Sequence, residues 1–242
     1  MISKIIVLAL AAAPLVAAHG KVAVISGDAG GNGTALGIQG AVVPGAGRNS
    51  KTEVDTTIFG STDIATDGLG RTEGSGKNTV DMLSQAMELS GSTLPQVSAD
   101  GNGSISGTFH IVTTDGAGPV QAVLDSTGTG AFSQGVMLNT VTQVPGTKGN
   151  IAAPGRGRRW LSKRAANVNE DYPVAFSVPA GTTCSGTVAG QQNVCLVKIA
   201  NSNKAGPFGG VVAIQMAGGA TTSATNTTAA AEERKRASKF SS

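Results

Sequence analysis

Short apolar runs separated by glycine, asparagine, aspartate and proline recur along most of this chain. Runs of four to eight apolar residues bounded by turn-forming residues are typical of strands. The glycine-dense segments between them, such as 26–50, predict long irregular loops. We therefore expect an all-β domain, an immunoglobulin-like or fibronectin-like β-sandwich. The predicted strands are 21–25, 105–112, 119–124, 136–144, 172–178, 196–199 and 211–216.

One segment has a helical pattern instead. In Asn78–Leu89 (NTVDMLSQAMEL), apolar residues recur at positions 80, 83 and 87. Asn78 can cap the start of a helix, and Gly91 can end it. The sequence therefore predicts one short helix in an otherwise β domain.

The two ends of the chain have different compositions. Residues 1–18 combine Lys4, an apolar run and small residues before a cleavage position, which predicts a secretory signal peptide and a mature chain that begins at His19. Residues 218–242 are polar and of low complexity, so we expect a disordered tail. The folded domain is then 19–217, and we expect it to be a secreted monomer.

Charge and hydropathy limit the kinds of partner that the chain can bind. The formal net charge is only +3, too small to indicate a nucleic-acid partner. No second apolar stretch approaches the length that would span a membrane. The dense basic cluster is Arg156–Arg164 (RGRRWLSKR), which contains Trp160. A solvated loop, a contact with an anionic polymer and a processing site after Lys163-Arg164 are all open interpretations of this cluster.

The two cysteines fit an exported protein. In an oxidising compartment we expect Cys184 and Cys195 to form a disulfide, with a reactive thiol as the alternative. Three Asn-X-Ser/Thr tripeptides, at Asn32, Asn102 and Asn226, are candidate N-glycosylation sites.

The chain has two histidines, and their positions favour metal chemistry. As the first residue of the mature protein, His19 offers its α-amine and one ring nitrogen, and His110 adds a third nitrogen from a rigid strand. Nitrogen donors in a tetragonal, T-shaped arrangement favour one copper ion. The alternative is that His110 is an ordinary packed side chain. A tetrahedral zinc site lacks ligands, because no CxxC or HxxxH spacing occurs.

Three stretches resemble a family of secreted fungal proteins, the Egh-type virulence factors associated with appressoria. They are HGKVAVISGDAGGNGTALGI, LPQVSADG and FHIVTTDGAGPVQAVLD. The resemblance extends from His19 to about Met216 and is most specific between His110 and Asp125. It implies a secreted protein of infection structures. The cysteines expected around DGAGP in that pattern are missing, and Ala122 stands on that strand.

The segment CLVKIANSNKAGPFGGVVAIQ is similar to the C-terminal part of some lytic polysaccharide monooxygenases. That likeness implies a histidine brace made by His19 and His110, with Phe208 at the axial position, where it blocks one coordination face. Phe208 as a plain core residue is the other interpretation. Members that activate oxygen hold Gln or Glu near the metal; Gly206 stands at that position here, and Gln215 is the nearest candidate for the role.

The leading hypothesis is a secreted copper-binding protein that oxidises wall or cuticle polysaccharides when it is catalytic. The alternative is a virulence or adhesion module without redox chemistry, or a copper carrier at the cell surface. The sequence names no substrate, and the catalytic role of bound copper is open because groups around a metal tune its redox chemistry.

Overall fold

The structure is a computed structural model that describes residues 19–40, 54–152 and 166–218. The expected signal peptide, the basic cluster 156–164, Asn226 and all but the first residue of the predicted tail lie outside the described residues.

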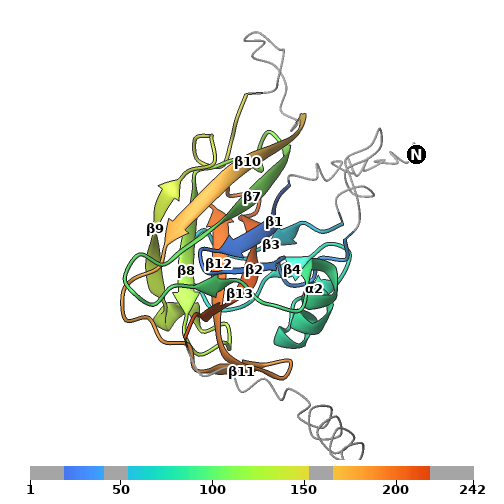
Figure 1. Ribbon diagram of the computed structural model, residues 1–242. Coiled ribbons are helices and arrows are strands. Elements are labelled where there is room, and N and C mark those ends of the chain that lie inside the picture. Colours follow the sequence, from blue (N-terminus) through green and yellow to red (C-terminus); the bar gives the residue numbers. More distant parts are fainter. Residues whose placement is uncertain (1–18, 41–53, 153–165, 219–242) are drawn as a thin grey trace, which may run out of the picture.

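Seven strands of the described chain form one closed sheet (Figure 1). Neighbours around the ring are antiparallel, except that β1 pairs with β13 in parallel. In ring order they are β12 (Gln191–Asn201), β8 (Val120–Asp125), β9 (Val136–Thr142), β10 (Asn167–Ser177), β7 (Ser104–Thr113), β1 (Gly20–Gly27) and β13 (Phe208–Met216).

Six shorter strands extend this ring. β2 (Gly30–Gly33) lies beside β1, β11 (Gly186–Val188) beside β12, and β6 (Gln96–Val97) beside β13. β3 (Thr57–Ile58) also pairs with β13, and it is followed outward by β4 (Arg71–Thr72) and then β5 (Gly76–Lys77). Part of the segment expected to be a long loop, 26–50, is therefore a hairpin of β1 and β2.

The all-β prediction is confirmed, but the sandwich expectation differs from the structure. A sandwich needs two separate sheets, whereas β12 here pairs with both β8 and β13 and closes the ring. Closure removes the unpaired edges that an open sheet exposes. The apolar patterns of barrels and sandwiches are alike, because both alternate inward and outward side chains.

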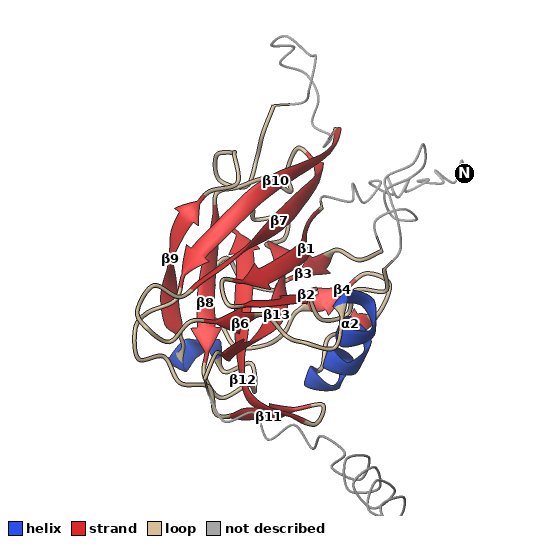
Figure 2. Ribbon diagram, in the orientation of Figure 1, coloured by secondary structure: helices blue, strands red, loops and turns tan. Residues whose placement is uncertain are grey.

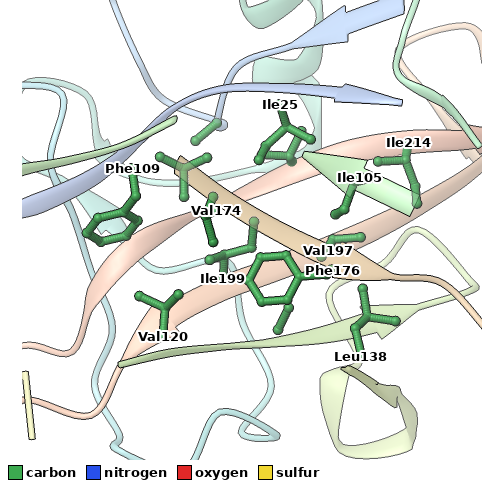
Figure 3. Packing of buried hydrophobic residues seen from close by; sticks show 14 of the residues in the cluster. Ile25, Ile105, Phe109, Val120, Leu138, Val174, Phe176, Val197, Ile199 and Ile214 are labelled. Atoms are coloured by element: carbon green, nitrogen blue, oxygen red, sulfur yellow. The ribbon is translucent and has the colours of Figure 1, made fainter. Parts of the chain in front are cut away.

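Two hydrophobic clusters lie on the two faces of this sheet. The first fills the inside of the ring and takes apolar side chains from all seven strands, including Phe109, Phe176 and Val197 (Figure 3). The second lies on the outer face and includes Leu196 and Val211 on the strands. It is covered by the helix and by the loops around β3 and β4. Strands buried on both faces explain why β12 and β13 read as nearly continuous apolar runs.

The predicted helix is present, but it starts differently. A 3-10 turn, η1 (Val80–Met82), leads into α2 (Leu83–Ser90), which lies at the side of the ring (Figure 2). Asn78 does not cap it: its side chain is buried and bonds Leu69 O and Thr72 Oγ1. Gly91 ends the helix with φ 111°, as predicted.

The predicted disulfide is confirmed, since Cys184 and Cys195 are bonded, with their Cα atoms 4.9 Å apart. Asn32 and Asn102 are both exposed, where glycans can be attached. Among the described residues, no helix has the length and hydropathy to cross a membrane.

Candidate functional site

His19 lies directly before β1 and is held by the end of β7. Its carbonyl oxygen accepts hydrogen bonds from Val112 N at 3.0 Å and Thr113 N at 3.2 Å. The residue is 0% exposed. The main chain therefore fixes His19 against the strand that carries the other histidine.

Strand register places the two histidines on one face of the sheet. Lys21 pairs with His110, and Gly20 pairs with Ile111, so His19 lies across from Val112. Side chains alternate along a strand, so positions 19, 21, 110 and 112 share a face. Diagonal neighbours in such a pair lie roughly 7–8 Å apart, which two imidazoles can bridge around one ion.

Asp171 fixes the tautomer of His110. Asp171 pairs with His110 across β10 and β7, and its Oδ1 lies 2.7 Å from the His110 Nδ1. An ionised carboxylate accepts hydrogen bonds, so a neutral His110 that donates Nδ1–H to it has its ring lone pair at Nε2. His110 is 7% exposed.

Glu73 performs the corresponding role at His19. It follows β4, and its Oε1 lies 2.9 Å from the His19 Nε2, close enough for an ion pair but not aligned as a hydrogen bond. In a neutral ring with its proton on Nε2, toward this carboxylate, the lone pair is at Nδ1. That Nδ1 is buried and makes no hydrogen bond.

The main-chain nitrogen of His19 also has a defined partner. It donates to Thr113 Oγ1 at 2.7 Å, and that hydroxyl donates to Asp115 Oδ1 at 2.7 Å. Burial raises the pKa of Asp115 above its usual range, against the opposing effects of Thr113 and His19. The nitrogen that cleavage would turn into an amine thus already points to a polar anchor.

Phe208 lies next to His19, where the likeness to monooxygenases places an axial residue. The two ring centroids are 6.1 Å apart with planes at 53°. Phe208 is 1% exposed, and its amide donates to Asn201 Oδ1 at 3.0 Å. The two buried rings therefore pack beside each other in a tilted arrangement.

Gln215 lies elsewhere. It is seven residues beyond Phe208 on the same strand, about 23 Å along it at strand spacing. Its amide is occupied by Gln96 Nε2 at 2.8 Å and Gln192 O at 2.7 Å. The structure does not bring Gln215 to the histidines, so its position does not support the predicted catalytic role.

Two carboxylates at the site were not predicted from the sequence. Glu73 stands in a turn between two-residue strands, 54 positions from His19, and Asp171 depends on the pairing of β7 with β10. No local motif marks either residue. Only the strand register reveals them.

These residues offer nitrogen atoms as candidate metal ligands. Within 19–40, 54–152 and 166–218, no three His, Cys, Asp or Glu side chains are grouped to hold a metal, so a two-histidine site needs a main-chain donor. The His19 nitrogen, its Nδ1 and the His110 Nε2 are the three donors available on one face. All three are nitrogens, which suits copper.

Comparisons with known proteins agree with the resemblance seen in the sequence. A family model described as Egh16-like virulence factor matches residues 17–209. The chain is 38% identical over 218 residues to the appressoria-specific virulence factor GAS1 of Pyricularia oryzae, covering 90% of this chain and 79% of that protein. It is 42% identical over 120 residues to GAS2 of the same fungus, covering 50% of this chain and 37% of GAS2. No solved structure matches.

Proposed function

Because this chain belongs to the Egh16-like virulence factor family, we propose that it is a secreted virulence factor that binds one copper ion. The ligands are the amine and Nδ1 of His19 and the Nε2 of His110. Residues 1–18 are the leader whose removal produces the amine. The similarity to appressorial proteins of a plant pathogen supports a role at infection structures.

One observation carries the copper proposal. Each of the two imidazoles has a carboxylate at one nitrogen, Glu73 at His19 Nε2 and Asp171 at His110 Nδ1. This leaves the lone pairs at the two nitrogens that a brace uses. Histidines that bind metals commonly donate their other N–H to such a partner, which fixes the tautomer and raises ligand basicity.

The chain's own residues prepare this site. Thr113 and Asp115 hold the His19 nitrogen in place, and Phe208 packs beside its ring. In the uncleaved chain the His19 nitrogen is a peptide amide, which is a poor neutral donor. Bound copper supplies reversible one-electron redox chemistry.

The burial of the histidines decides whether copper binding alone or polysaccharide oxidation is the first candidate. A polymer-oxidising metal has to lie where a polysaccharide can approach it, but His19 and His110 are 0% and 7% exposed in the full chain. We therefore place copper binding first. Oxidation of wall or cuticle polysaccharides is the second candidate, favoured by the contact between Phe208 and His19.

The test is a calorimetric titration of processed protein with Cu(II). Protein that begins at His19 should bind one equivalent tightly. A matched protein whose N-terminal amine is acetylated keeps both imidazoles and loses the α-amine as a ligand, so its affinity should fall by at least about tenfold. Equal affinity of the two proteins would refute a brace. Oxidised products from cellulose or chitin, formed only with a reductant, would establish the second candidate.

A further inference from the structure

Lys198 on β12 is a buried amine that the copper proposal does not use. It is 3% exposed and lies on the outer face of the ring, among the apolar side chains of the second cluster. Its Nζ lies 4.5 Å from the centre of the Phe132 ring and 5.0 Å from that of Phe59. Lysines are rarely buried to this extent unless they have a partner.

The amine donates two hydrogen bonds to main-chain carbonyls. Nζ donates to Ile64 O at 3.3 Å and to Thr66 O. A neutral amine has two hydrogens and one lone pair, so two carbonyl acceptors satisfy both hydrogens and leave the lone pair. The charged form keeps the same two bonds and faces the rings of Phe59 and Phe132.

A hollow of about 260 Å³ lies at this amine. Lys198 lines it together with Phe59, Gly60, Thr66 and Asp67. It is large enough for a small organic molecule of a few heavy atoms. Phe59 contributes an apolar wall, and Gly60 has no Cβ to narrow the opening.

Asp67 is the carboxylate of this hollow. Hydrogen bonds from Ser133 N at 2.7 Å and Ser133 Oγ at 3.1 Å hold the pKa of Asp67 below its usual range. Asp67 is therefore ionised at neutral pH. The hollow thus has a buried lysine and an ionised carboxylate on its lining, and a lysine that is removed from water can form an imine with a carbonyl compound.

We propose that the Lys198 hollow captures small aldehydes as an imine on Nζ. The lone pair of the amine adds to the carbonyl carbon, and Asp67 relays one N–H proton, through water, to the oxygen, which gives a carbinolamine. The second N–H proton reaches the hydroxyl by the same route, so that water leaves when the C=N bond forms. The reaction is reversible and needs no oxidant or reductant.

Titration of the amine agrees with this geometry. Burial lowers the pKa of Lys198 from 10.5 to about 8, against the opposing charges of Asp67 and Asp63. At pH 7.5 about a quarter of such an amine is neutral, compared with about a thousandth of an ordinary lysine. The reactive fraction is thus roughly 200 times larger.

The test uses acetaldehyde as the probe and cyanoborohydride to trap the imine as a stable ethylamine. Peptide mass spectrometry of the native protein compares Lys198 with the exposed Lys77 and Lys148. We expect Lys198 to be ethylated at least about tenfold faster at pH 7.5, with a rate that rises half-maximally near pH 8. Labelling of Lys77 and Lys148 while Lys198 stays unmodified would overturn the proposal.

Two controls keep the result specific. Unfolding in guanidinium should abolish the preference, since burial of the amine causes it. Asp67→Asn removes the proton relay, and it also removes a charge that raises the pKa of Lys198. At pH 9.5, where the amine is mostly neutral in both proteins, the variant should ethylate Lys198 more slowly and Lys77 at an unchanged rate. An unchanged rate at Lys198 in this variant would contradict the role given to Asp67. Both comparisons use lysines within one protein, so they do not require a Lys198 variant to fold.

Discussion

At the scale of single residues, carboxylates decide what the two histidines can do. An imidazole binds a metal only through a nitrogen with a free lone pair, and a carboxylate at the opposite nitrogen decides which one that is. Glu73 is 2.9 Å from His19, and Asp171 is 2.7 Å from His110. In the proposed brace, the two contacts favour metal binding through Nδ1 at His19 and Nε2 at His110.

Removing these carboxylates one at a time should weaken the site without removing a ligand. We expect Glu73→Gln and Asp171→Asn each to lower copper affinity by about 10- to 100-fold, because the partner no longer fixes the ring. A competition titration against a copper chelator measures this. Lys21→Gln on the same face is the matched control and should change affinity little; an effect of equal size there would indicate general electrostatics instead.

Asp125 stabilises the fold and does not belong to the candidate metal site. It is 2% exposed and accepts hydrogen bonds from Thr127, Thr129, Gly130 and Ala131. Burial raises its pKa, but these hydrogen bonds outweigh burial and hold the pKa of Asp125 below its usual range. The ionised carboxylate therefore organises the turn after β8.

The effect of removing that carboxylate on the free energy of unfolding should depend on pH. A lowered folded-state pKa contributes stability that is present above the unfolded value near 4 and is lost as pH falls through the folded pKa. Asp125→Asn should cost about 2–3 kcal/mol of unfolding free energy at pH 7, from unsatisfied buried donors. In urea melts, the difference from wild type should shrink below pH 4; a constant difference would contradict this role.

At the scale of elements, the turn after β7 holds the start of β1. A Cβ on Gly116 would lie 1.8 Å from the carbonyl oxygen of His19 and 2.6 Å from Gly20 N. Both are main-chain atoms, so no side chain can move aside. The close approach of this turn to His19 requires glycine at position 116. It also fixes the position of His19, the first candidate ligand.

Gly116→Ala should therefore displace His19 from β7 and weaken copper binding more than tenfold, measured by calorimetry. Gly60→Ala is a matched control, because a Cβ there meets no atom within 4 Å. If both variants bound copper equally well, the turn would not position the site.

The disulfide links the loop before β11 to strand β12. Cys184 and Cys195 are 11 positions apart, so the crosslink closes a short loop. The double variant Cys184→Ser and Cys195→Ser should lose at most about 3 kcal/mol of unfolding free energy in urea melts. A larger loss would mean that the bond does more than limit the unfolded chain.

At the scale of the whole molecule, local patterns predicted elements and missed their closure. The apolar runs at 119–124, 136–144 and 211–216 correspond to β8, β9 and β13. The ring depends on pairings between distant segments, such as β1 with β13, which periodicity does not encode. Sequence patterns therefore predicted the strand content and could not distinguish a closed ring from a sandwich.

The candidate site, like the fold, was predictable from the sequence only in part. His19, His110 and Phe208 stand out in the sequence by rarity or resemblance, and the structure brings His19 beside Phe208 and onto the face of His110. Gln215 was predicted because it is near Phe208 in the sequence. The two residues lie on one extended strand, so they are far apart in space. Glu73 reaches the site only through tertiary packing.

The most direct test of the account is electron paramagnetic resonance of processed protein carrying one equivalent of Cu(II). Wild type should give one axial spectrum with hyperfine structure from nitrogen ligands. His19→Ala and His110→Ala should each lose that spectrum, whereas Gln215→Ala should keep it. A spectrum unchanged in either histidine variant, or no tight copper in protein shown to begin at His19, would contradict the brace.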